Sequence, residues 1–273
     1  MKSDRKVMYQ VMNLATPPLC ALILLLSNVG FSGSVFGSSY RHLLSPNELT
    51  FAIWGPIFLF QAAFYFYQAR DILRPAEEKL DMPYVLEVGP FFMLSWLSSS
   101  LWYILWASGM VWPAIAAMYA YLLTTLGAYL GLGINLRGRP IRDHIFVTVG
   151  WSMLTGWVTV ATIVNTTTGL ALSGFEPGPL GEAGWAAIFL VIVLGIYLTV
   201  LYTRNDYVFT GVGAWAVLGI LIERLNPVNP TQPLVVLVAA AGLVVVIGAV
   251  IFRVVRQQRT GKFHLLPTMK TVQ

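Results

Sequence analysis

The chain has 273 residues, of which 57% are hydrophobic and only 11% are charged. An ordinary soluble domain carries charge on about a quarter of its residues, so this composition excludes that class. The net charge of +5 is spread along the chain without a basic stripe, which argues against a nucleic-acid partner. The single cysteine, Cys20, lies in an apolar run and excludes both a disulfide framework and a thiolate metal site.

Eight apolar runs follow one another along the chain, each near the roughly 20 residues that a helix needs to cross a bilayer. We therefore predict an all-α fold, a polytopic membrane bundle of eight transmembrane helices. The first run follows a basic lead, but no small-residue cleavage pattern closes it, so we interpret it as a retained anchor. The runs cover residues 8–28, 49–70, 84–109, 112–134, 143–165, 182–203, 207–223 and 232–252.

Basic residues lie almost only at alternate joints between these runs. Of the 17 Lys and Arg residues, 15 fall on one predicted side, and only Arg41 and Arg224 fall on the other. Because cytoplasmic loops of membrane proteins are enriched in Lys and Arg, both termini are predicted to be cytoplasmic. We expect an integral protein of a bacterial or archaeal cytoplasmic membrane, surrounded by membrane lipid.

Ionisable side chains avoid the centres of all eight predicted spans. Such residues mark ion pathways and proton relays, so their absence disfavours a carboxylate-driven pump or symporter. Two outer loops, residues 29–48 and 166–181, are long enough to be functional covers. The second is rich in Gly and Pro and predicts a domain boundary near Gly174. We expect a five-helix part, residues 1–170, and a part with three further helices and a cytoplasmic tail, residues 171–273.

Aromatic and polar side chains share one helical face in each of the second and third predicted spans. Two such faces can enclose a flat apolar ligand through ring stacking and a few hydrogen bonds. Helix packing is the alternative, because serines let membrane helices approach closely, and the spacing leaves both interpretations open. The residues are Trp54, Phe58, Gln61 and Tyr65 in the second span and Ser95, Ser99, Trp102 and Trp106 in the third.

Three stretches of the sequence resemble a known family. The stretch LTFAIWGPIFLFQAAFYFYQAR is similar to the second span of the TspO/MBR family, the tryptophan-rich sensory proteins related to the peripheral benzodiazepine receptor. The stretch GWVTVATIVN resembles the fifth span of that family, and SSSLWYILW stands where the family has its third-span tryptophan motif. The resemblance covers about residues 8–170, and the last three spans look like those of longer family members.

The resemblance implies a five-helix bundle with a pocket beneath the loop between the first two spans. The implied ligand is a small apolar molecule of the tetrapyrrole type, a porphyrin or haem bound as a ligand, with no cofactor required. Sterol binding is disfavoured because Thr166, Thr167 and Thr168 replace the aromatic and basic residues of the family's sterol-recognition motif. The candidate binding residues are Trp54, Phe58, Gln61, Ser99, Trp102, Trp106, Trp157 and Asn165.

Three functions stay open at this point. The first is a ligand-binding regulator or carrier, either as a single chain or as a homodimer. The second is a porphyrin-modifying enzyme that uses Trp54 and Trp157 as redox-active rings. The third is a structural or assembly subunit. We expect the last three spans to affect stability or assembly and the pocket to lie within residues 40–165.

One conflict within the fifth span bears on the pocket. Trp157 and Thr159 lie about 200° apart around a helix, so they cannot both face one pocket. The family resemblance favours Trp157. We therefore expect Thr155, Thr159 and Thr162 to bond the carbonyls four residues earlier or a neighbouring helix.

Overall fold

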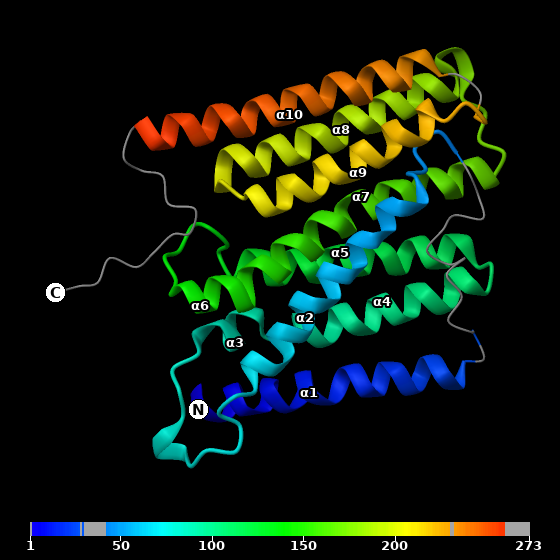
Figure 1. The fold of residues 1–273 in the computed structure, drawn as a ribbon. Helices are drawn as coiled ribbons and strands as arrows, with labels where there is room; N and C mark the ends of the chain where they lie inside the picture. Colours follow the sequence, from blue (N-terminus) through cyan, green and yellow to red (C-terminus); the bar gives the residue numbers. More distant parts are fainter. Residues whose placement is uncertain (1, 28, 30–41, 230–231, 260–273) are drawn as a thin grey trace.

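The computed structural model describes residues 2–27, 29, 42–229 and 232–259. Within these ranges the chain is helical and forms no strand. Its helices run back and forth along a common direction (Figure 1). Seven of the described helices are long and apolar enough to cross a membrane. The predicted all-α class is therefore confirmed, and the helices have the lengths that a membrane protein requires.

Some helices of the first part follow one another directly. The 3-10 helix η2 runs directly into α2, and α6, the π-helix η4 and α7 follow one another without a break. The elements are α1 (Lys2–Leu26), η2 (Glu48–Ile53), α2 (Trp54–Gln68), η3 (Ala76–Glu78), α3 (Pro83–Val88), α4 (Phe91–Ala107), α5 (Val111–Gly131), α6 (Ile141–Asp143), η4 (His144–Thr148) and α7 (Val149–Leu172).

Three long helices complete the chain. They are preceded by a short 3-10 turn, and the helix α8 ends at Asn205, which adopts the left-handed conformation. The elements are η5 (Gly178–Leu180), α8 (Gly181–Arg204), α9 (Tyr207–Leu225) and α10 (Pro233–Arg259).

The predicted third span, residues 84–109, is not one continuous helix. The helix α3 ends at Gly89, whose φ of +52° is readily adopted only by glycine, and α4 begins after Pro90. Proline has no N–H to continue the hydrogen-bond ladder, so the sequence Gly-Pro separates the two helices. The helix α4 is apolar but has 17 residues, fewer than the roughly 20 of a full span. Eight full-length spans are therefore not seen in the described residues.

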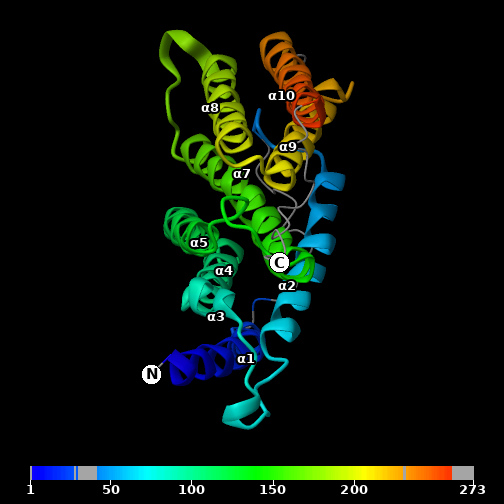
Figure 2. The same cartoon turned by 90° about the vertical axis from the view of Figure 1, so that its left-hand side faces the viewer.

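The helix α7 lies in the middle of the molecule. It packs against α5 and α2 on one side and against α8 and α9 on the other, and the view along the helices shows the same order (Figure 2). In the most apolar stretch of the helix that contains α7, 72% of the residues are buried, whereas the corresponding share for α1 is 22%. The helix α1 lies at the far edge, against α4. The site described below is therefore built around α7.

Both described chain ends lie at the same end of the bundle, where α1 begins and α10 finishes (Figure 1). The turns after α2, α5 and α8 reach this end too (Figure 1). The arrangement agrees with the alternation of basic joints in the sequence. That this end faces the cytoplasm stays a prediction.

Asp206 connects three helices at the basic end. Its Oδ1 accepts a hydrogen bond from the backbone N–H of Phe209 (3.0 Å) and so caps α9. Its Oδ2 accepts from the hydroxyl of Tyr129 on α5 (2.8 Å) and from Ser152 Oγ on α7 (2.6 Å). The Asp206 residue is only 1% exposed. One carboxylate therefore fixes the positions of α5, α7 and α9 relative to one another.

We expect Asp206→Ala to lower the free energy of unfolding by about 2 to 4 kcal/mol. The substitution removes a helix cap and leaves two buried hydroxyls without their acceptor. Thermal unfolding in detergent would measure the loss, with Asp81→Ala, an exposed carboxylate before α3, as the matched control. Equal stability of the two variants would contradict a structural role for Asp206.

Candidate functional site

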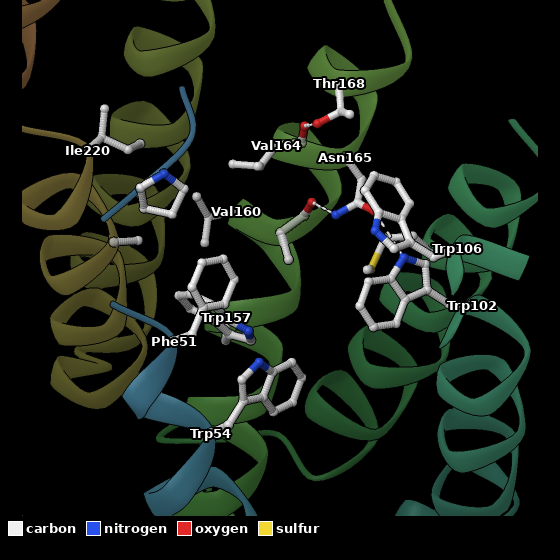
Figure 3. A pocket seen from close by; sticks show the side chains of 14 residues that line it. Phe51, Trp54, Trp102, Trp106, Trp157, Val160, Val164, Asn165, Thr168 and Ile220 are labelled. Carbon is white, nitrogen blue, oxygen red and sulfur yellow. Dashed lines mark hydrogen bonds between the residues drawn. The ribbon is translucent and has the colours of Figure 1, made fainter. Parts of the chain in front are cut away.

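A cavity of about 60 Å³ lies at the meeting point of six elements: η2, α2, α4, α5, α7 and α9. Aromatic rings form much of its wall, and Figure 3 shows them facing a common space. None of the lining residues in the described part of the chain is charged. The lining residues are Pro46, Phe51, Trp54, Trp102, Trp106, Met118, Trp157, Val160, Ala161, Val164, Asn165, Thr168, Ala216 and Ile220.

The aromatic rings stand in two groups across the cavity (Figure 3). On one side, Trp157 meets Trp54 edge to face at 6.1 Å between ring centroids, and it meets Phe51 in the same way at 5.8 Å. On the other side, Trp102 and Trp106 of α4 lie 6.2 Å apart at an angle of 33°. Edge-to-face pairs hold the rings at fixed angles. The cavity therefore has two aromatic walls contributed by separate helices.

Two polar side chains of the wall, Asn165 and Thr168, already bond within the protein. Asn165 accepts a hydrogen bond from Trp102 Nε1 (2.9 Å) and donates one to the carbonyl of Ala161 (2.8 Å). Thr168 donates to the carbonyl of Val164 (2.9 Å). Because these bonds fix the amide and the indole, Asn165 sets the orientation of Trp102. The surface that faces the cavity is thus largely apolar.

The sequence-predicted residues divide between two neighbouring cavities. Trp54, Trp102, Trp106, Trp157 and Asn165 line the cavity just described. A smaller cavity of about 30 Å³ is lined by the remaining three, Phe58, Gln61 and Ser99, together with Trp54. The Trp54 ring thus stands between the two spaces. Ligand binding by these residues stays a prediction.

Two of the residues at the smaller cavity, Phe58 and Gln61, have contacts of their own. Phe58 stacks on Trp54 at 5.3 Å between centroids and is 52% exposed. Gln61 donates to the carbonyl of Gly150 on α7 (3.3 Å), so its amide joins two helices. Trp54, Phe58 and Gln61 do lie on one face of α2, as their spacing predicts, but this face borders two cavities.

Hydrogen bonds resolve the conflict within the fifth span. Thr159 donates to the carbonyl of Thr155 (2.8 Å), and Thr162 donates to that of Val158 (2.7 Å). Thr155 instead reaches the carbonyl of Thr125 on α5 (3.3 Å). None of these three threonines lines the main cavity, whereas Trp157 does. The expectation drawn from helix geometry and the family resemblance is confirmed.

The cavity extends beyond residues 40–165, the range within which the ligand pocket is predicted to lie. Thr168 lies in a further turn of α7, and Ala216 and Ile220 of α9 form part of the wall. Periodicity within one helix cannot show which distant helix packs against it. The stretch GVGAWAVLGI of α9 does indicate a packed helix face, because small residues mark the faces where membrane helices come close.

The helix α9 also positions η2. The backbone N–H of Asn47 donates to the carbonyl of Gly219 (3.0 Å), and Trp215 Nε1 donates to the carbonyl of Thr50 (2.8 Å). A Cβ atom on Gly219 would lie 1.9 Å from Thr50 Oγ1, so only glycine permits this approach. Because η2 carries Phe51 and leads into Trp54, contacts with α9 fix one aromatic wall of the cavity.

The predicted cover, residues 29–48, lies largely outside the described residues. Its described end begins at His42, whose Nδ1 accepts a hydrogen bond from the backbone N–H of Leu44 (3.2 Å). The proton of the neutral ring therefore sits on Nε2. Burial lowers the pKa of His42 to about 4. A bond to the Val164 backbone raises it, and the charge of Arg224 lowers it.

Comparisons with known proteins support the resemblance read from the sequence. A family model described as TSPO-like protein matches residues 10–252 of the chain. The match continues past residue 170 and ends within α10, so it includes α8 and α9. Comparisons with curated proteins and with solved structures gave no match.

We expect Gly219→Ala to displace η2 and to lower stability by about 1 to 3 kcal/mol, the usual cost of overpacking. Gly211→Ala is the matched control, because it lies on the same helix and its new Cβ would meet nothing within 4 Å. Alanine favours a helix over glycine, so the control is expected to be neutral or slightly stabilising. Thermal unfolding of both variants measures the difference, and equal unfolding temperatures would contradict the close contact.

We also expect stability to depend on pH through His42. The folded pKa of about 4 lies below the usual 6.5, so the unfolded chain binds the proton first. Stability therefore falls as the pH drops from about 6.5 towards about 4 and is unaffected by this group at higher pH. Thermal unfolding at several pH values, compared between the natural chain and His42→Asn, isolates the effect. Parallel curves for the two proteins would contradict it.

Proposed function

Because this chain belongs to the TSPO-like family, we propose that it is a helical membrane protein that binds a flat apolar ligand of the tetrapyrrole type for regulation or transport. The ligand would lie in the cavity between η2, α4, α7 and α9. One observation carries the proposal, the convergence of Trp54, Trp102, Trp106 and Trp157 on a single cavity. Packing alone does not require four indoles from three helices to face one space.

The chemistry of the wall suits an apolar aromatic molecule. Indole faces and edges bind another ring by stacking and by edge-to-face contact. The polar atoms of Asn165 and Thr168 are engaged within α7 or with Trp102, so they offer few free hydrogen bonds to a polar ligand. Recognition would therefore rest on shape and stacking, and a ring system with polar groups only at its edge fits best.

A tetrapyrrole needs more room than the cavity offers. The cavity volume of about 60 Å³ is well below the roughly 300 to 1,000 Å³ of common ligand pockets. Trp54 lines both the main and the smaller cavity, so rotation of its ring would join the two spaces. Trp54 lies where η2 gives way to α2 and is only partly buried, which leaves it freer to turn than Trp157. We propose that the ligand enters by displacing the Trp54 ring.

The proposal is tested by titrating the purified protein, reconstituted in nanodiscs, with protoporphyrin while recording absorbance. A saturable shift of the porphyrin band is expected. Trp157→Ala should weaken binding by about 1 to 3 kcal/mol, the scale of losing one stacking ring. We choose Trp157 for substitution because its ring contacts both Phe51 and Trp54 within the wall.

Trp112→Ala serves as the matched control. Trp112 is 50% exposed, donates to Ser173 Oγ (3.0 Å) and does not line the cavity. Its removal should leave the titration unchanged. Equal losses in the two variants, or the absence of a saturable shift in the natural protein, would refute the proposed site.

A further inference from the structure

A third cavity lies outside the proposed tetrapyrrole site. Its volume is about 180 Å³, three times that of the main cavity, and it lies at the end of the bundle opposite the basic joints. It is bordered by the segment at residues 42–44, the last turns of α7, the connection to α8 and the first turns of α8. The helix α8 lies beyond the predicted five-helix part, so this cavity does not belong to that part alone.

Aromatic rings form one wall of this cavity. Trp185 meets Phe175 edge to face at 5.7 Å between centroids, and it meets Phe189 at 6.2 Å. The Trp185 Nε1 donates to the carbonyl of Pro177 (3.1 Å), which holds the indole in place. Two phenyl rings beside a fixed indole offer both faces and edges to a bound molecule.

The charges around the cavity favour a cation. Among the described lining residues, Glu182 is the only charged side chain. His42 also lines the cavity, as a neutral ring with Thr167 Oγ1 3.4 Å from its nitrogens. The nearby Arg224 lies beside a carboxylate, with its Nη2 3.9 Å from Glu223 Oε1. A carboxylate next to aromatic rings attracts an organic cation through both charge and the ring quadrupole.

We propose that this cavity, enclosed by His42, Thr167, Phe175, Glu182, Trp185 and Phe189, binds an organic cation with an apolar aromatic body, an aryl-alkyl ammonium compound. The aromatic body packs against Phe175 and Phe189, and the ammonium group lies between the Trp185 ring and the Glu182 carboxylate. The site is separate from the proposed tetrapyrrole site and does not depend on it.

The last turns of α7 form a wall of both cavities. Val164, Asn165 and Thr168 face the tetrapyrrole site, whereas Thr167 and Leu170 face the cation site. Two different faces of one helix therefore serve two ligands of different chemistry. Substitutions at one site can be made without removing a lining residue of the other.

Binding of radiolabelled benzyltrimethylammonium to the full chain in phosphatidylcholine nanodiscs tests the proposal. Neopentylbenzene, in which carbon replaces the charged nitrogen, is the neutral competitor of the same shape. Saturable binding of the cation is expected, with little displacement by the neutral compound. Equal competition by the neutral compound would show that the cavity takes any apolar molecule and would overturn the proposal.

Glu182→Gln should weaken cation binding about threefold to fivefold, as expected for an exposed carboxylate. Glu176→Gln is the matched control, since it removes an acidic charge from the connection just before α8 but does not line the cavity. Trp185→Leu should weaken binding about tenfold through loss of the cation–π contact. If Glu182→Gln and Glu176→Gln bind the cation equally, the proposed role of the carboxylate is wrong.

Two further variants locate the site. Ala171→Phe places a ring in the cavity from α7 and should abolish binding, because Ala171 is one of its lining residues. Trp157→Ala should leave cation binding unchanged, whatever its effect on protoporphyrin. Cation binding that survives Ala171→Phe, or that falls with Trp157→Ala, would place the cation elsewhere and overturn the proposal.

Discussion

Close approach of three neighbours to the backbone of α7 is the contact on which the structure depends. A Cβ atom on Gly150 would lie 3.1 Å from Phe60 of α2, and one on Gly156 would lie 3.1 Å from the carbonyl oxygen of Phe209 on α9. One on Gly169 would lie 2.4 Å from the side chain of Ile115 on α5. In a bilayer, where the hydrophobic effect does not drive helices together, such close packing supplies much of the association energy. The glycines thus place α7 in the centre.

A central helix presents several faces, and each face of α7 has its own role. One face bonds threonine hydroxyls back to the helix or to α5, so these polar groups are satisfied without water. Another face carries Trp157 and Asn165 to the aromatic cavity. The outer turns carry Thr167 and Leu170 to the wall of the cavity that we propose as a cation site. Two cavities can therefore lie beside one helix while remaining chemically distinct.

The sequence was sufficient to predict the features that depend on local pattern. Apolar runs gave the helices, and helix geometry with the family resemblance placed Trp157 towards the cavity and Thr159 away from it. The sequence was not sufficient to predict the contacts between helices that are distant in the chain. The approach of Gly219 to Thr50 joins residues far apart in the chain, so no periodicity within one span reveals that α9 walls the pocket. The break at Gly89 and Pro90 was visible as a dipeptide, but its effect depended on the left-handed turn that the chain adopts there.

Hydrogen bonds connect α8 and α9 closely to the helices around the aromatic cavity. The Tyr197 hydroxyl of α8 donates to the carbonyl of Gly156 in the middle of α7 (2.8 Å), and Asp206 before α9 bonds residues of α5 and α7. Through Trp215 and Gly219, α9 also sets the position of η2 and hence of Phe51 and Trp54. The family match through residue 252 agrees with a fold in which α8 and α9 are part of the same unit as the aromatic cavity.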